Sequence, residues 1–248
     1  MPSHSLKIWQ EPVPGNTYAI GADPAEGLRH GDDSAACVLD CTSGEQVAEL
    51  QGKIEPFAFA ENLYALGLYY NSALLAIESN KDGGANKVLF ELEYKNIYYE
   101  MKETGMPYQK PTAKLGYNMN VRTRGILVPQ ARKYLEDQSV VVRSDALLAQ
   151  FETFILEDDK FQAIARGFDD LVIAFCIACE MLRVQLLRGD VANNTLNPIW
   201  KGKEVQEIGG EDIDAFWDDR PRSHRLAAKK LEEQDIVEAS TMGNLAGF

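Results

Sequence analysis

The sequence is poor in cysteine, in histidine and in long apolar runs, and each shortage excludes a class of protein. Four cysteines and three histidines among 248 residues are too few and too irregularly spaced for a disulfide framework or a histidine metal site. No run of 18 apolar residues occurs, so no segment is predicted to span a membrane, and the N-terminus lacks the apolar core of a signal peptide. With 19 Gly and 10 Pro, the chain is neither collagen-like nor of low complexity. A globular protein in a reduced, cytosolic setting fits these absences.

Basic residues are outnumbered as well. The chain has 38 acids and 25 bases, a formal net charge of −13, which by itself argues against nucleic-acid binding. The charge is uneven, however, because no acidic residue lies between Thr104 and Leu135. We predict that the six cations of this stretch bind DNA phosphates, the alternative being a solvated basic helix face; they are Lys110, Lys114, Arg122, Arg124, Arg132 and Lys133.

The spacing of apolar residues predicts strands first and then alternating helices and strands. The first three predicted strands, joined by polar turns, are residues 17–23, 34–40 and 46–54. This order favours an α/β fold whose mixed sheet has three antiparallel strands, further parallel strands, and helices on both faces. Residues 171–187 are nearly all apolar and predict a buried helix. The predicted organisation is an irregular lead-in of residues 1–16, a core of residues 17–188 and a partly ordered tail of residues 189–248.

Acids at the ends of predicted elements are the residues that point to chemistry. Asp23 closes the first strand, Glu78 closes a later apolar strand, and Asp169-Asp170 opens the last helix. Carboxylates brought together in this way need a cation between them, and Mg²⁺ or Mn²⁺ suits oxygen ligands. Two such ions about 4 Å apart would polarise a phosphodiester, activate water and neutralise the leaving oxygen. The sequence therefore predicts a two-metal site.

Other chemistry-bearing residues have simpler interpretations. Asp32 and Asp33 lie in a Gly-Asp-Asp-Ser turn, and we interpret them as turn residues. Asp82 is predicted to shape a turn or cap the helix that follows. Cys176 and Cys179 lie in the middle of the apolar helix, which predicts buried thiols and not a redox or zinc site.

Several motifs together carry a resemblance to a known family. They are IGADPAEG with GDDSAACVLD, then LLAIESNKDGGANKVLFEL, LGYNMNVRTRGILVPQARKYL and ARGFDDLVIAFCIA, in this order across about residues 17–187. The chain resembles the nuclease domain of the large terminase subunit of tailed bacteriophages, a member of the ribonuclease H-like superfamily. The family usually has a histidine where Phe168 stands, so any role of that histidine is missing here.

The resemblance implies a metal-dependent endonuclease that cuts double-stranded DNA with little sequence specificity during viral genome packaging and leaves a 5′ phosphate. It implies catalytic metal ligands at Asp23, Glu78 and either Asp170 or Asp169, of which we favour Asp170 as the direct ligand. The implied cofactors are Mg²⁺ or Mn²⁺, with two ions expected. Another ribonuclease H-like nuclease, such as a junction resolvase or a transposase core, and a non-catalytic docking module of the motor are the alternatives.

The motif G-x-x-x-x-G-K-[ST], which binds ATP phosphates in packaging motors, is missing from the sequence. We therefore expect an isolated C-terminal nuclease domain without ATPase activity. The resemblance implies double-stranded DNA, an ATPase domain, a portal and a small terminase as partners, with no membrane, in the cytoplasm of the host. It also implies that the tail contacts other motor parts.

Overall fold

The computed structural model describes residues 4–80, 82–102, 112–157, 160–164, 167–188 and 206–209. Its main sheet has the strand order β10-β1-β4-β3-β2-β5, in which β2 and β5 are parallel and the other neighbours are antiparallel. The strands are β1 (His4–Ile8), β2 (Tyr18–Asp23), β3 (Ser34–Asp40), β4 (Gln46–Gly52), β5 (Leu74–Ile77) and β10 (Gln206–Gly209).

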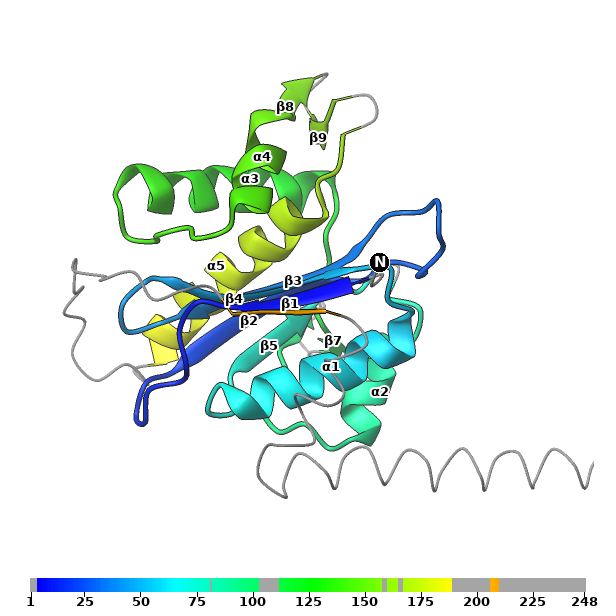
Figure 1. Cartoon of the computed structure of the whole chain (residues 1–248), viewed down its shortest axis with the longest axis vertical. Helices are drawn as coiled ribbons and strands as arrows, with labels where there is room; N and C mark the ends of the chain where they lie inside the picture. Colours follow the sequence, from blue (N-terminus) through cyan, green and yellow to red (C-terminus); the bar gives the residue numbers. More distant parts are fainter. Residues whose placement is uncertain are drawn as a thin grey trace, which may run out of the picture.

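Helices cover both faces of this sheet (Figure 1). The helices are α1 (Pro56–Tyr69), α2 (Ala85–Glu91), α3 (Val121–Glu136), α4 (Asp145–Glu152) and α5 (Asp170–Arg188). Helices α1 and α2 pack on one face, and α5 packs on the other with α3 and α4 beyond it. The remaining strands form two antiparallel pairs outside the main sheet. These are β6 (Tyr99–Lys102) with β7 (Thr112–Leu115), and β8 (Phe154–Glu157) with β9 (Lys160–Ala163).

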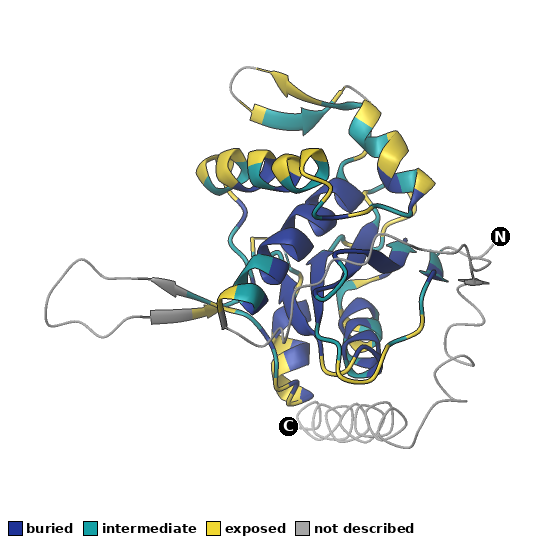
Figure 2. Ribbon diagram, turned by 90° about the vertical axis from the view of Figure 1, so that its left-hand side faces the viewer, coloured by how far each residue is buried: buried dark blue, intermediate teal, exposed yellow. Residues whose placement is uncertain are grey.

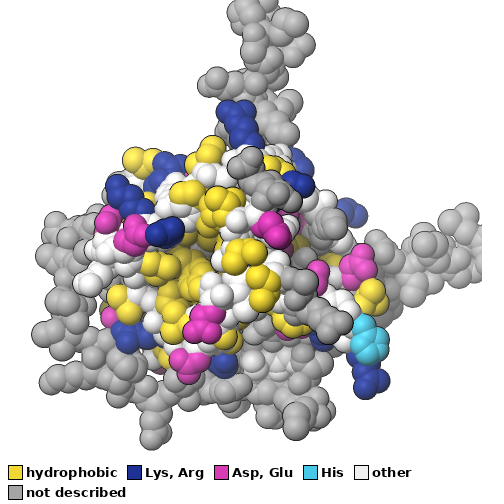
Figure 3. All heavy atoms as spheres, turned by 90° about the horizontal axis from the view of Figure 1, so that it is seen from above, with side chains coloured by type: hydrophobic (Ala, Val, Ile, Leu, Met, Phe, Trp, Pro, Cys, Tyr) yellow, Lys and Arg dark blue, Asp and Glu magenta, His cyan; other side chains and the backbone are white. Residues whose placement is uncertain are grey.

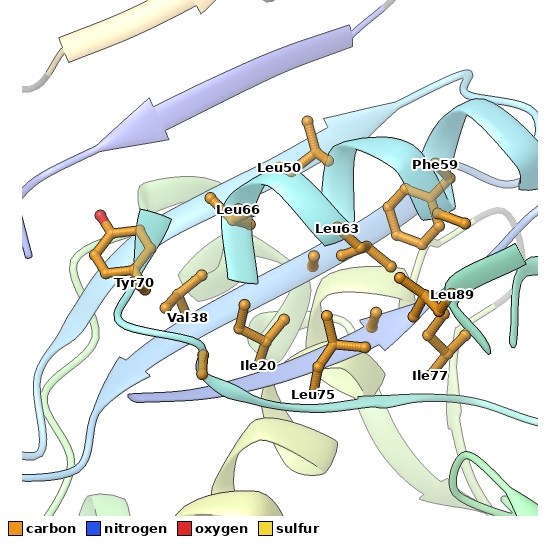
Figure 4. Close-up of a cluster of buried hydrophobic side chains, with 14 of the residues drawn as sticks. Ile20, Val38, Leu50, Phe59, Leu63, Leu66, Tyr70, Leu75, Ile77 and Leu89 are labelled. Atoms are coloured by element: carbon orange, nitrogen blue, oxygen red, sulfur yellow. The ribbon is translucent and has the colours of Figure 1, made fainter. Parts of the chain in front are cut away.

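Side chains that alternate along each strand differ in size between the two faces. On the α1 face many of them are large, and Figure 4 shows Ile20, Val38 and Leu75 beneath α1. Each such fully buried side chain contributes roughly 2 kcal/mol to stability. On the α5 face, β2 and the start of β3 carry small residues, Ala19, Gly21, Ala35 and Cys37. The small side chains allow a helix to approach this face closely.

Helix α5 uses that space. A Cβ atom added to Gly21 would collide with the backbone of α5 at Ala174 and Ala178. The helix is buried along most of its length because it fills the space between the sheet and α3, whereas the hairpin β8–β9 is largely exposed (Figure 2). No helix within the described residues is both long enough and apolar enough to cross a membrane.

The structure confirms a mixed sheet with helices on both faces, and it corrects the prediction in three places. Residues 4–8 form β1, which pairs with β4, so the prediction of an irregular lead-in over residues 1–16 is wrong there. Residues 139–142, whose mostly apolar sequence also predicts a strand, form only an isolated bridge, at Val141. Strand β7 lies within residues 102–120, where the glycine, proline and asparagine content predicts a loop. Of the predicted tail beyond α5, only β10 falls within the described residues, and it extends the sheet beside β1.

Candidate active site

Asp23 and Glu78 leave the sheet side by side. Ala22 and Ile77 are partners in the parallel pair β2–β5, and the Glu78 amide donates to the Ala22 carbonyl at 2.8 Å. Because side chains alternate along a strand, Asp23 shares the α5 face with Ala19 and Gly21, and Glu78 shares it with Leu74 and Ala76. The register of two strands therefore places two carboxylates at one edge of the sheet, on one face.

The electrostatics of Asp23 reflect this position. Burial raises the pKa of Asp23 well above its usual range, and the charge of Glu78 and a hydrogen bond with its side chain raise it further. The charges of Asp170 and Asp169 act in the same direction. All four predicted acids are therefore close enough to influence one carboxyl group.

Asp170 begins α5 and is 5% exposed. Its burial raises its pKa to about 7. The Asp33 amide, which donates to Asp170 Oδ2 at 3.3 Å, lowers that pKa, whereas the charges of Asp32, Asp169 and Asp33 raise it. Asp170 is thus the most buried of the four acids, and a backbone amide holds one of its oxygens.

The start of α5 is fixed by a side chain from α4. The Gln150 Oε1 atom accepts hydrogen bonds from the amides of Leu171 at 2.9 Å and Val172 at 3.4 Å. These amides have no partner within the helix, because the first turn of any helix lacks carbonyls to receive them. Together with the close approach at Gly21, this cap brings the first turn of α5 to the edge where Asp23 ends β2.

Asp169 is bound differently from Asp170. Its Oδ2 atom forms an ion pair with Arg124 Nη2 at 2.9 Å. Arg124 also donates to the Phe161 carbonyl at 2.9 Å and lies 5.9 Å from the centre of the Phe154 ring. Arg124 therefore connects α3, the hairpin β8–β9 and Asp169, and its guanidinium neutralises one of the four acids.

The chemistry of the donor set fits a divalent cation. Four carboxylates at one edge repel one another, and a hard cation offsets this repulsion. Within the described residues, however, no three His, Cys, Asp or Glu side chains already have an arrangement that could hold a metal ion. The predicted ligands are brought together in the fold, but their oxygens do not form a finished coordination shell.

A cavity of about 310 Å³ lies beside Glu78. The start of α3 and strand β9 form its other walls; the lining residues are Glu78, Met119, Asn120, Val121, Arg124, Lys160, Phe161 and Gln162. The Asn120 side chain caps α3 by accepting from the amides of Arg122 and Thr123 at 3.0 Å. The cavity thus joins one predicted acid to two cationic side chains and to the N-terminus of a 16-residue helix.

The predicted DNA-binding cations differ in exposure and pairing. Lys110 lies outside the described residues, and Lys114 is exposed on β7. Of those on α3, Arg122 and Lys133 are exposed, whereas Arg132 pairs with Glu136 at 2.7 Å and Arg124 pairs with Asp169. On the face seen in Figure 3, Lys and Arg side chains lie mostly toward the rim, and hydrophobic side chains occupy the middle.

Comparison with known proteins gives results at the level of structure only. No family model and no curated protein matches this chain. The large terminase nuclease of the thermophilic phage G20c is 18% identical, with a TM-score of 0.55 over 71% of this chain and 87% of that chain. Its form with bound magnesium is 19% identical, with a TM-score of 0.55 over 71% and 86%. The large terminase nuclease domain of Thermus phage P74-26 is 20% identical, with a TM-score of 0.51 over 69% and 83%.

This chain has the fold of a large terminase nuclease domain. The likeness confirms the ribonuclease H-like α/β fold predicted from the sequence, and at these identities it concerns the fold alone.

Within this terminase nuclease fold, the residues interpreted as structural behave as expected. Asp82 shapes the turn before α2 by accepting from the Gly84 and Asn86 amides at 3.3 and 3.2 Å. Cys176 and Cys179 are free thiols, each 1% exposed. Burial raises the pKa of Cys176 to about 12. Both cysteines are therefore packing residues in the core.

The sequence interpretation missed Lys53, Gln150 and Lys160, three side chains next to the acids or the cavity. Lys53 binds Asp33, Gln150 caps α5, and Lys160 lines the cavity beside Glu78. Only Lys53 had a usable signal, because the antiparallel pairing of β3 with β4 places Lys53 opposite Asp33. The other two come from α4 and β9, whose positions depend on tertiary packing.

Proposed function

We propose that this chain is a metal-dependent endonuclease that cleaves double-stranded DNA with little sequence specificity during viral genome packaging. The convergence of Asp23, Glu78, Asp169 and Asp170 at one edge of a terminase nuclease fold carries this proposal. The magnesium-bound form of the G20c nuclease adds support for a divalent cofactor.

The proposed ligands are Asp23, Glu78 and Asp170, and Mg²⁺ or Mn²⁺ is the proposed cofactor, with two ions per site. Bound divalent ions supply Lewis-acid activation of water and of the phosphodiester. The carboxylates orient that chemistry from rigid elements, since two of them follow paired strands and the third starts a buried helix. Asp169 has the lesser role in this proposal because Arg124 occupies its Oδ2 atom.

The proposed DNA path crosses the cavity beside Glu78 and the exposed start of α3. Arg122 is exposed there, and Lys160 and the α3 N-terminus lie at the cavity wall. Cations and helix N-termini bind phosphate oxygens without reading base sequence, which suits cleavage with little specificity. Lys114 and Lys133 extend the predicted contacts to other parts of the surface.

The partners proposed from the resemblance are an ATPase domain, a portal and a small terminase, in the cytoplasm of the host. Residues 189–248 are proposed to contact these motor parts. This proposal is separate from the one for the acids and the cavity. A pull-down of the chain with isolated portal protein tests it directly.

Plasmid nicking in Mg²⁺ or Mn²⁺ tests the function. We expect conversion of supercoiled DNA to nicked and linear forms, and loss of that conversion in chelator. Preference for four-way junctions over linear duplex would instead indicate a resolvase. The lack of any saturable Mn²⁺ binding by calorimetry would contradict the proposal and favour a docking module.

A further inference from the structure

Lys53 lies at the end of β4 directly opposite Asp33. Ser34 and Gly52 are partners in the β3–β4 pair, so the next residue outward on each strand is Asp33 and Lys53. The Lys53 Nζ atom is 2.5 Å from Asp33 Oδ1 and donates to the Gly31 carbonyl at 2.7 Å. Gln51 donates to the other Asp33 oxygen at 3.2 Å. Gln51 of β4 and Lys53, which directly follows β4, therefore hold the Asp33 carboxylate.

Asp33 also contacts the candidate metal site. Its backbone amide donates to Asp170 Oδ2 at 3.3 Å. Lys53 also lies 5.9 Å from the centre of the Phe168 ring, and Phe168 comes two residues before Asp170. Lys53 thus connects the end of β4, the turn between β2 and β3, and the segment that leads into α5.

The Lys53 ammonium is directed to the protein and not to solvent. Its side chain is 25% exposed, and two of its three protons are directed to Asp33 and Gly31. A lysine that recruits DNA phosphates as a point charge needs a free, mobile ammonium group. Lys53 is therefore poorly placed as a DNA contact and well placed as a support.

We propose that Lys53 is a positioning residue for the divalent-cation site: by holding Asp33, it keeps the Asp33 amide on Asp170 and so orients the Asp170 carboxylate for the metal. This inference rests on the proposed function, because it assigns Asp170 to a metal. Residues that orient metal ligands typically change metal affinity or activity by 10- to 100-fold when they are replaced.

The substitution Lys53→Met separates positioning from charge because the two effects have opposite signs. Removal of a cation near four carboxylates strengthens divalent-cation binding if Lys53 acts only through its charge. Loss of positioning weakens binding. We expect the Mn²⁺ dissociation constant of Lys53→Met, measured by titration calorimetry on the full chain, to rise about tenfold.

A double-mutant cycle tests the route through Asp33. Asp33→Asn keeps the backbone amide but removes the ion pair with Lys53. If Lys53 acts through Asp33, adding Lys53→Met to Asp33→Asn lowers the Mn²⁺ affinity little further. Lys87→Met is the matched control, since Lys87 is an exposed lysine paired with Glu91 at 3.2 Å. We expect its Mn²⁺ affinity to equal that of the unmodified chain.

A readout without metal keeps this test independent of catalysis. In the metal-free protein, Lys53→Met is expected to shift the Asp33 amide NMR resonance and to speed its hydrogen exchange at least tenfold. Tighter or unchanged Mn²⁺ binding by Lys53→Met would overturn the inference, as would an unchanged Asp33 amide. If the unmodified chain itself binds no Mn²⁺, the proposed function is contradicted. That result differs from one in which the unmodified chain binds Mn²⁺ and Lys53→Met binds it equally well, which contradicts only the role of Lys53.

Discussion

The two pairs of acids reach the same edge of the sheet by different means. Asp23 and Glu78 are placed by backbone pairing, because Asp23 ends β2, Glu78 directly follows β5, and these two strands form a parallel pair. Asp169 and Asp170 are placed by the packing of α5 on Gly21 and are held by Arg124 and by the Asp33 amide. The first pair is fixed once the sheet forms, whereas side chains adjust the second pair.

This difference separates the part of the site that defines the fold from the part that is tunable. The register of a strand pair cannot change by small steps, since a slip by one residue turns every side chain of the strand to the other face. The strength of an ion pair or of a single hydrogen bond, in contrast, varies continuously with geometry and solvent exposure. The predictions below test this contrast, from the largest expected effect to the smallest.

Replacement of a strand-end acid is expected to abolish activity. Asp23→Asn and Glu78→Gln each remove a predicted metal ligand, and we expect plasmid nicking to fall about a thousandfold, equivalent to several kcal/mol. Asp170→Asn is expected to match them, whereas Asp169→Asn retains more activity because Arg124 already neutralises Asp169. Circular dichroism serves as the control for folding, and full activity in Asp23→Asn would refute the site.

Gly21→Val tests whether close packing places the helix-start pair. The added side chain collides with the α5 backbone at Ala174 and Ala178, so we expect a loss of more than about 3 kcal/mol in the free energy of unfolding. Gly125→Ala is the matched control, because nothing lies within 4 Å of a Cβ atom there. That control in α3 should gain up to about 1 kcal/mol. Equal stability of the two variants in urea would contradict the packing account.

The raised pKa of Asp170 makes stability depend on pH in metal-free buffer. Its pKa is about 7 in the folded state and about 3.9 when unfolded, so the folded state binds more protons between these values. The contribution of Asp170 to stability therefore falls as pH rises from 4 to 7, by at most about 4 kcal/mol, and this contribution is level above pH 7. Asp170→Asn should reduce this fall, and urea unfolding at pH 5 and pH 8 measures it. An unchanged slope would exclude Asp170 as its source.

Arg122→Gln is expected to have the smallest effect. Arg122 is exposed at the start of α3, so its loss should weaken DNA binding by about three- to tenfold and reduce the slope of log affinity against log salt by about one. Arg132→Gln is the comparison, because Arg132 pairs with Glu136. A filter-binding titration at several salt concentrations distinguishes the two, and slopes that equal the slope of the unmodified chain in both variants would show that neither residue contacts phosphate.

Local patterns in the sequence predicted the strand-end acids, the buried helix α5 and the hairpin turn at Asp32-Asp33. An apolar run that ends on a carboxylate is visible in the sequence because strand and acid are adjacent. The prediction that Asp23 and Glu78 meet needed only that their strands run side by side, which the structure confirms.

The side-chain restraints could not be predicted in the same way. Arg124 belongs to an acid-free stretch and was assigned to DNA, but its partner Asp169 lies 45 residues further along the chain. Lys53 and Asp33 are 20 residues apart; the predicted antiparallel strands make them neighbours, but the register that brings the two side chains into contact appears only in the structure. Strand β1 is only five residues long, and Pro12, Pro14 and Gly15 after it obscured its alternation of polar and apolar residues.

The most direct test of the account is a crystal of the chain soaked in Mn²⁺, with the anomalous scattering peaks located. The account predicts at least one peak bound by carboxylate oxygens of Asp23, Glu78 and Asp170, at distances of about 2 Å. Peaks only at other surfaces, or a metal bound by Asp23 and Glu78 without Asp170, would contradict the proposed convergence of the three acids.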